Sequence, residues 1–323
     1  MSARAWVAFA VVSVLWGIPY LLIKVAVDEG VPPGFVAWVR VVLAAAALLV
    51  FAPRAGVLSV LRGRARWVGV FALSEIVVPF PLIAIGEQHV SSSLTAILIA
   101  AAPLFVALLA LRFDASERVR GRRLAGLVIG LGGVVALMGV DVAGRAAELF
   151  GAVAILTAAL FYATGPMVLK RHLSGVDPRA SMGATLILAS LLLSPAAVLT
   201  PPATMPTPPA IAALLVLGLL CTAAPLVLYT VLIAEAGAGR AVLITYVNPV
   251  VAVALGMMIL GERPGVGAIP GSLLILVGSW LSGGGRLPSR RRPVRRAVAP
   301  EAGGGRTTDA LDATPGGPSP GGP

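Results

Sequence analysis

The sequence predicts an all-α integral membrane protein of ten transmembrane helices, arranged as two inverted five-helix repeats. Only 12% of its 323 residues are charged and 58% are hydrophobic, with a mean hydropathy of +0.95; a soluble domain carries about 25% charged residues. The apolar residues form repeated runs of about 20, the length that crosses a hydrocarbon core of ~30 Å. The two halves also share one residue pattern, which predicts the repeat.

The repeat is clearest at residues 237–280, where an apolar stretch containing Asn248-Pro249 is followed by a Gly-Glu-Arg-Pro turn and a second stretch rich in small residues. Residues 91–137 have the same layout, and Pro103 lies 146 positions before Pro249. The other equivalent pairs are 145 or 146 positions apart: Trp16 and Tyr162, Lys24 and Lys170, Pro79 and Pro225, Glu117 and Glu262, Gly126 and Gly271, Gly133 and Gly278.

Three regions follow from this pattern. The first repeat is expected at 1–140 and the second at 147–282. Residues 286–323 are basic and rich in Gly and Pro without apolar periodicity, which predicts a disordered cytoplasmic tail. Hydropathy places the ten spans at about 6–26, 34–51, 67–86, 93–111, 124–140, 148–168, 181–199, 210–233, 241–260 and 267–282.

Loop charge predicts the orientation of these spans. With a cytoplasmic N-terminus, the outer loops hold only Arg145 and Arg263. The inner loops then hold Arg54, Arg62, Arg64, Arg66, Arg112, Arg118, Arg120, Arg122, Arg123, Lys170, Arg171, Arg179 and Arg240, followed by the basic tail. Because positive residues are retained on the cytoplasmic side, both termini are expected there, in a bacterial cytoplasmic (inner) membrane.

An odd number of helices in each repeat makes the second copy enter the membrane from the opposite side. Inverted repeats of this kind are a recurring plan for secondary transporters, because exchanging the conformations of the halves converts an inward-open into an outward-open state. A duplication kept for stability alone is the alternative.

Several other classes of function are disfavoured. Cys221 is the only cysteine, so no intrachain disulfide can form. His89 and His172 fall in different halves, no P-loop occurs and no catalytic set converges, so we expect neither metal, cofactor nor enzymatic activity. The net charge of +11 resides in loops and the tail, which points to membrane topology and not to nucleic acid.

The chain resembles ten-helix members of the drug/metabolite transporter superfamily, of the EamA-domain type. In the first half the resemblance rests on Trp16-Gly17, Lys24, Arg40 and the 94–103 run followed by Glu117 and the later glycines; in the second half it rests on the 241–249 run, Leu260-Gly261-Glu262, Gly271 and Gly278. The chain departs from the family at 113–117, where Phe-Asp-Ala-Ser-Glu replaces the usual Leu-Gly-Glu. The resemblance implies a carrier for small organic solutes, often an exporter. It also implies a cavity lined by the first, third, fourth, sixth, eighth and ninth helices.

Glu75 is the main candidate for transport chemistry because it lies in the middle of the third span. An ionisable group at the membrane centre costs at least ~2.5 kcal/mol and usually faces a cavity. Glu75 is therefore expected to bind substrate or to couple transport to protons. Arg40 offers a fork of donors to a carboxylate. The alternative for both is a structural ion pair with each other.

Aromatic residues beside helix breaks complete the predicted substrate site. Paired Gly and Pro interruptions at equivalent positions indicate the binding region of a transporter. The predicted substrate-binding residues are Trp16, Tyr20, Arg40, Glu75, Tyr162, Tyr229, Tyr246 and Asn248. The predicted helix-break or gating residues are Pro19, Pro79, Pro103, Pro166, Pro225 and Pro249. The alternatives are helix kinks with interfacial aromatics and, for Asn248, satisfaction of a carbonyl freed by Pro249.

Small-residue motifs open the fifth and tenth spans, as Gly126-x-x-x-Gly130 and Gly267-x-x-x-Gly271. Such motifs allow close helix approach, either between these two helices or in a homodimer. The turn residues Glu117 and Glu262 are expected to be solvated.

We therefore expect a secondary transporter of small organic metabolites such as amino acids, moving them outward by alternating access with possible proton coupling. Its partners would be a small-molecule substrate and the lipid bilayer. A hydrophobic-cation or drug efflux pump is the alternative among transporters. A non-transporting membrane scaffold and a lipid-modifying membrane enzyme are the alternatives from other classes.

Overall fold

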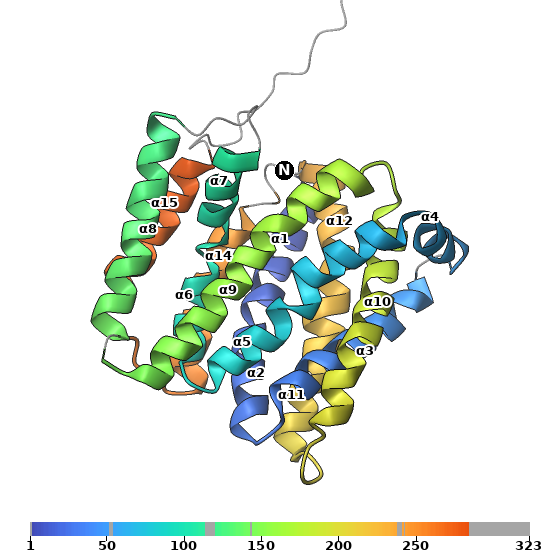
Figure 1. Ribbon diagram of the computed structural model, residues 1–323, viewed down its shortest axis with the longest axis horizontal. Coiled ribbons are helices and arrows are strands. Elements are labelled where there is room, and N and C mark those ends of the chain that lie inside the picture. The colour runs from blue at the N-terminus through green and yellow to red at the C-terminus, as the bar shows by residue number, and fades with distance from the viewer. Residues whose placement is uncertain are drawn as a thin grey trace, which may run out of the picture. The chain divides into compact units, whose positions relative to one another are not determined.

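The computed structural model describes residues 2–51, 54–113, 120–142, 144–237, 241 and 243–283, and these residues form helices and connections without a strand (Figure 1). The predicted tail and Glu117 lie outside the described residues. The α-helices are α1 (Ala3–Gly17), α2 (Pro19–Asp28), α3 (Pro33–Phe51), α4 (Arg54–Ala72), α5 (Pro79–Glu87), α6 (Ser92–Ile99), α7 (Ala102–Phe113), α8 (Arg122–Asp141), α9 (Ala146–Val168), α10 (Pro178–Leu199), α11 (Pro208–Gly218), α12 (Ala224–Ala236), α14 (Ile244–Ile259) and α15 (Ala268–Ser282). Three π-helical turns interrupt them: η1 (Leu73–Val77), η3 (Leu169–Leu173) and η4 (Leu219–Ala223).

Eight segments of the described chain are long and apolar enough to cross a membrane. They are Ala3–Asp28, Pro33–Val50, Gly56–Glu87, Ser92–Arg112, Arg122–Asp141, Ala146–Leu173, Pro178–Leu199 and Pro208–Ile233. The predicted ninth and tenth spans correspond to α14 and α15, which are apolar but have 16 and 15 residues. A perpendicular crossing takes about 17–25 residues. The all-α membrane architecture is confirmed, while the count of ten spans stays a prediction.

Two of the π-helical turns occupy equivalent positions in the two halves. Leu73 and Leu219 begin η1 and η4, 146 positions apart, and each turn is followed by a proline at the start of the next α-helix, Pro79 or Pro225. Proline lacks an N–H and its ring clashes with the carbonyl four residues back, so a regular helix cannot pass through it unchanged. Widened turns of this kind often occur at functional sites.

The other predicted breaks differ in form. α2 begins at Pro19, directly after the end of α1, and Pro103 lies in the first turn of α7 after the short break that ends α6. Pro166 and Pro249 lie inside α9 and α14, so the helix continues through them.

Helices from the two halves of the sequence alternate in space. α1 packs against α12 and α14, α3 against α10, and α2 against α11, while α5 packs against α9 (Figure 1). Each of these pairs joins one helix from the first half to one from the second. Side chains that meet between the halves therefore come from distant parts of the sequence.

The small-residue motifs pack α8 against α15. A Cβ added at Gly126 would come within 2.9 Å of the Gly278 carbonyl oxygen, and one at Gly133 within 3.1 Å of the Gly271 carbonyl oxygen. Glycine is therefore required for the two backbones to approach this closely. Of the two uses that the sequence allowed, the structure shows packing between these helices, and a homodimer stays a prediction.

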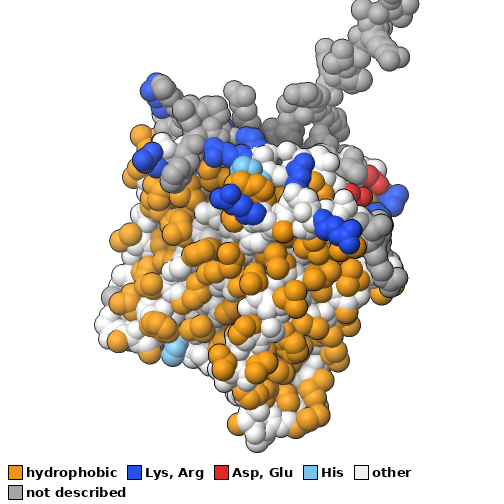
Figure 2. Space-filling view, turned by 45° about the vertical axis from the view of Figure 1, so that its right-hand side comes forward, with side chains coloured by type: hydrophobic (Ala, Val, Ile, Leu, Met, Phe, Trp, Pro, Cys, Tyr) orange, Lys and Arg blue, Asp and Glu red, His pale blue; other side chains and the backbone are white. Residues whose placement is uncertain are grey.

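The molecular surface is apolar along the helices and basic at one end. Figure 2 shows hydrophobic side chains over most of one face and Lys and Arg side chains gathered toward its upper edge. Exposed basic residues on α4 and η3 include Arg62, Arg66 and Lys170. α4 and η3 meet where Arg64 Nη1 donates to the His172 carbonyl oxygen at 2.5 Å.

Candidate functional site

Arg40 on α3 is buried between the two halves, with 8% of its surface exposed. Its Nε donates to Thr222 Oγ1 on η4 at 2.8 Å, and Thr222 Oγ1 in turn donates to the Leu217 carbonyl oxygen at 2.8 Å. The guanidinium carbon lies 4.0 Å from the ring centroid of Phe80 on α5, a cation–π contact. Among the described residues, Nε is the only guanidinium nitrogen with a hydrogen-bond acceptor. The remaining donors of the fork are therefore available to a ligand.

Two tyrosines lie around this guanidinium. Tyr20 on α2 and Tyr162 on α9 are both partly buried and pack against the same apolar cluster. Each is within electrostatic range of Arg40, as is Cys221 on η4. Three elements from the two halves, α2, α9 and η4, therefore place polar atoms around Arg40.

Glu75 lies on η1 and is partly buried against α9. A Cβ added at Gly165 would overlap the Glu75 carboxylate, so this glycine provides the space in which the carboxylate lies. Next to it, Thr164 Oγ1 donates to Ser74 Oγ at 2.9 Å, which joins α9 to η1. Tyr162 lies within electrostatic range of Glu75 and extends the polar group toward Arg40.

Arg40 and Glu75 do not form the ion pair that the sequence left open. Among the described residues the ion pairs are Arg4–Glu235, Lys24–Asp28 and Arg145–Glu148. Arg40 is instead held by a threonine and an aromatic ring, and Glu75 lies against a glycine. A partly buried acid and a buried base are thus both present and separate.

The remaining predicted substrate residues form a second group on α1, α12 and α14. The rings of Trp16 and Tyr229 have centroids 5.0 Å apart. The Asn248 amide, oriented with its nitrogen toward acceptors, donates to the Ser13 and Ile244 carbonyl oxygens at 3.1 and 3.0 Å. The bond to Ser13 joins α14 to α1, and the bond to Ile244 lies within α14, so Asn248 has a structural role in this conformation.

Gly17 of α1 belongs to the same contact region, and Tyr246 lies on the same helix as Asn248. Tyr246 is partly buried, one turn before the proline of α14. A Cβ at Gly17 would come within 2.6 Å of Val251 Cγ1, so the glycine allows α1 to approach α14. The eight predicted residues therefore divide into an Arg40–Glu75 group and a group that joins three helices.

The expectation that Glu262 is solvated is wrong. Its Oε1 accepts from the Ser92 backbone N–H at 2.7 Å, and its Oε2 accepts from the Ser93 backbone N–H at 2.9 Å and from Ser93 Oγ at 2.5 Å. The first N–H groups of a helix have no partner within it and form a favourable site for a carboxylate. Glu262 thus caps α6 from the α14–α15 connection.

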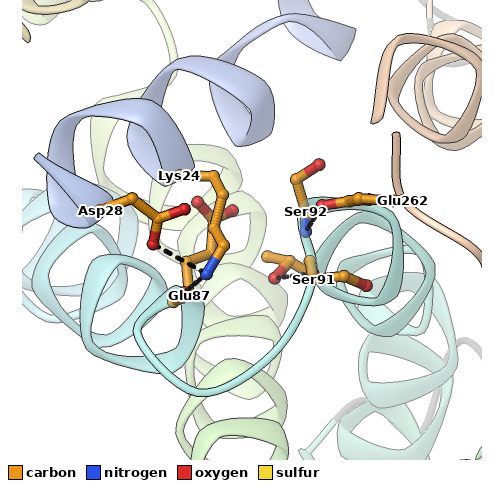
Figure 3. A network of polar contacts seen from close by, with 7 residues as sticks. Lys24, Asp28, Glu87, Ser91, Ser92 and Glu262 are labelled. Carbon is orange, nitrogen blue, oxygen red and sulfur yellow. Dashed lines mark hydrogen bonds and ion pairs between the residues drawn. The ribbon is translucent and has the colours of Figure 1, made fainter. Parts of the chain in front are cut away.

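Sequence reasoning also missed Glu87, which lies at the end of α5 and is fully buried. Lys24 Nζ donates to the Glu87 carbonyl oxygen at 2.8 Å and pairs with Asp28 Oδ1 at 3.0 Å. Figure 3 shows Lys24, Asp28 and Glu87 on one side of this network, with Ser91, Ser92 and Glu262 on the other. Glu87 lies at the end of a span, where the sequence pattern carries no signal of burial.

A surface cavity of about 290 Å³ lies beside this network. Its polar lining includes His89, Asp141, Arg145, Glu148 and Arg263, and the Arg145–Glu148 pair spans 2.7 Å. None of the eight predicted substrate residues lines it. The cavity is therefore separate from the Arg40–Glu75 group.

Taken together, the long apolar helices and the buried polar groups between the two halves define a polytopic membrane protein of the transporter class. The chain belongs to the EamA-like transporter family, whose model matches residues 4–139 and again residues 149–284. This confirms the resemblance that the sequence motifs indicated.

The names of two related proteins agree with the assignment to a transporter family. A protein of Escherichia coli K12 named as a probable amino-acid metabolite efflux pump is 25% identical over 293 residues, covering 87% of this chain and 95% of the relative. One of Streptantibioticus cattleyicolor, named as a probable terminal-alkyne amino-acid exporter, is 30% identical over 301 residues, covering 90% and 97%. A solved crystal structure with 19% identity and a TM-score of 0.61 covers 87% of this chain and 98% of that chain and has a similar fold.

Proposed function

We propose that this protein is a secondary active exporter of amino acids and related zwitterionic metabolites. The observation that carries the proposal is the separation of Arg40 from Glu75 within one group of polar residues. A buried base and a partly buried acid that do not pair leave a carboxylate site and an ammonium site. A zwitterion bound between them would neutralise both, which lowers the cost of keeping charges inside the membrane.

The binding roles follow from the chemistry of each side chain. The free donors of the Arg40 fork bind the substrate carboxylate. Glu75 receives the substrate ammonium group, or a proton when the substrate has left, which makes it the coupling residue. Tyr20 and Tyr162 lie within electrostatic range of Arg40 and offer rings and hydroxyls to the rest of the substrate.

Alternating access in this proposal uses ten spans in two inverted repeats, with α14 and α15 as the ninth and tenth. The two family matches, the equivalent π-helical turns and the alternation of helices from both halves support it. The basic ends of α4 and η3 support a cytoplasmic position for the N-terminus in a bacterial inner membrane. The two relatives named for amino acids support the substrate class.

The competing functions make different demands on the site. A hydrophobic cation would be repelled by the buried Arg40, so the structure gives less support to a drug efflux pump. A scaffold predicts that neutralising Arg40 and Glu75 together leaves the cellular phenotype unchanged. A lipid-modifying enzyme requires catalytic groups at one membrane face; the described residues contain no group of three or more His, Cys, Asp or Glu able to hold a metal ion.

The test compares extracellular metabolites of cells that express the wild type with those that express Glu75→Ala at matched membrane levels. Accumulation of amino acids outside only the wild-type cells would support export. The Arg40→Ala variant should give the same loss, because each charge binds one end of the substrate. If all three metabolite profiles match, the proposed exporter is wrong.

A further inference from the structure

Glu87 is fully buried between helices, and its surroundings differ from those of the partly buried Glu75. Its exposed fraction is 0%, and neither carboxylate oxygen has a hydrogen-bond partner among the described residues. An ionised carboxylate without a donor is strongly disfavoured in such a place, whereas a protonated one is far less costly.

The packing around Glu87 leaves little room for relaxation. A Cβ added at the preceding Gly86 would come within 2.5 Å of Ile155 Cγ1, and one at Gly151 within 2.8 Å of the Gly86 carbonyl oxygen. α5 and α9 are therefore in backbone contact on this side, and α9 presents apolar atoms there. The ring of the nearby His89 meets Phe150 and lies at the surface.

The charged groups that act on Glu87 come from three other elements and balance one another. They are Lys24 and Asp28 on α2, Arg40 on α3, and Glu262 in the α14–α15 connection. The neutral phenol of Tyr20 on α2 also lies within range. Lys24 pairs with Asp28, and Glu262 is held by the N-terminus of α6. Two positive and two negative groups thus act on Glu87 in opposite senses, and its burial without a hydrogen-bond donor is the larger cost of ionisation.

The same region joins the ends of three helices. Lys24 of α2 holds the end of α5 through the Glu87 carbonyl oxygen, and Glu262 holds the start of α6. The Ser92 hydroxyl is also buried and has no hydrogen-bond partner in the described part of the chain (Figure 3 shows Ser92 opposite Glu87 in the network). Two unsatisfied polar groups thus lie where α2, α5 and α6 meet, at the end of the bundle that is sealed by these contacts.

We propose that Glu87 is a proton-binding site that closes this end of the transporter when it is occupied. The ligand is a proton and not a metal cation, because the Lys24 ammonium already lies at the Glu87 backbone and would repel a second cation. The inference rests on the alternating access proposed above. It adds a proton site separate from the one that receives substrate.

The proton is exchanged with the aqueous phase on this side. When α2, α5 and α6 separate, water reaches Glu87 and the carboxylic acid releases its proton to solution. Closure reverses the step: the carboxylate takes up one proton and enters the protein as a neutral acid. In the proposed orientation this is the outer side, so external acid favours closure.

Infrared spectroscopy of the purified full-length protein tests the site without any substrate. At neutral pH the wild type should show the stretching band of a protonated carboxylic acid, displaced in deuterated buffer. Because Glu75 would also be protonated in the absence of substrate, the comparison is made in a Glu75→Gln background. Adding Glu87→Gln should remove the band, and adding Glu29→Gln, whose side chain is exposed, should retain it. An unchanged carboxylic-acid band after adding Glu87→Gln would overturn the proposal.

A second variant covers the case in which Glu87→Gln does not reach the membrane. In the same Glu75→Gln background, Glu87→Asp keeps the carboxyl but withdraws it by one methylene, so the frequency of the band should change. A band at an unchanged frequency in Glu87→Asp would assign it to another residue and overturn the proposal.

Proteoliposomes with L-leucine as the probe separate this inference from the proposed function. Glu87→Gln should retain leucine exchange, and its rate should depend less on the pH at the Glu87 side than the wild-type rate does, the remaining dependence arising at Glu75. The same pH dependence in Glu87→Gln and wild type would overturn the Glu87 assignment alone. Absence of leucine movement by the wild type would instead contradict the amino-acid exporter, and the infrared result would still decide Glu87.

Discussion

Arg40 Nε and Thr222 Oγ1, 182 positions apart in the sequence, are joined by a hydrogen bond of 2.8 Å. The bond connects α3 of the first half to the π-helical turn η4 of the second. It is the direct polar contact through which the turn in one half holds the buried base of the other. Removing this hydrogen bond therefore tests its contribution both to the stability of the protein and to transport.

Thr222→Val removes the hydroxyl and keeps the shape. The variant leaves a buried charged group short of an acceptor, and we expect a loss of about 1–3 kcal/mol in the free energy of unfolding. A lower Tm of the purified protein measures it. Thr185→Val is the matched control, because that buried hydroxyl donates to Ser181 of its own helix. Equal Tm values for the two variants would show that the Arg40 contact contributes nothing specific.

Gly165→Ala tests the placement of Glu75. The added methyl group would overlap the Glu75 carboxylate, so we expect the carboxylate to be displaced and export to fall at normal expression. Gly139→Ala on α8 is the control, since a Cβ there meets no atom within 4 Å. Extracellular amino acids measured at equal membrane protein levels report the effect. Wild-type export by Gly165→Ala would separate Glu75 from the transport step.

Glu262→Ala should destabilise the start of α6. The loss of a helix cap typically costs about 0.5–2 kcal/mol, and here one side chain satisfies two backbone N–H groups. The Tm should fall in Glu262→Ala and change little in Arg263→Ala, whose side chain is exposed at the next position. A Tm equal to that of the wild type would mean that solvent replaces the cap without cost.

Cysteine labelling tests the proposed orientation. In a Cys221→Ala background, Met205→Cys in the α10–α11 connection should react with an impermeant maleimide on intact cells, because Met205 is 85% exposed. Gly63→Cys, exposed on α4, should react only after the cells are opened. The reverse pattern would place the N-terminus outside.

The sequence predicted the features that depend on composition and local pattern. The apolar runs predicted the membrane-spanning helices. The motifs around Trp16, Arg40 and Glu262 predicted the family, and the family matches agree. Pro79 and Pro225 fall where two helices begin because proline acts on its own backbone and on the preceding turn. Such effects are local, so one sequence is enough to predict them.

The errors concern contacts between distant segments. The Arg40–Glu75 ion pair was one of two alternatives left open, because depth along two helices does not say which way either side chain points around its helix. Glu262 was wrongly expected to be solvated. Its partners, Ser92 and Ser93, are 170 and 169 positions away, and no local pattern indicates such contacts. Glu87 was missed because burial at a span end depends on the neighbours, here α2 and α9.

The equivalent turns η1 and η4 also bear on how the two halves of the chain evolved. A π-helical turn arises when a helix accommodates one extra residue, and removing it would rotate the preceding segment by about 100° relative to the following one. Both halves contain the turn at the same register, 146 positions apart. If the halves arose by duplication, the inserted residue was already present in the single-repeat ancestor. The two copies have since diverged at the equivalent position within the turn, which is Glu75 in the first half and Cys221 in the second.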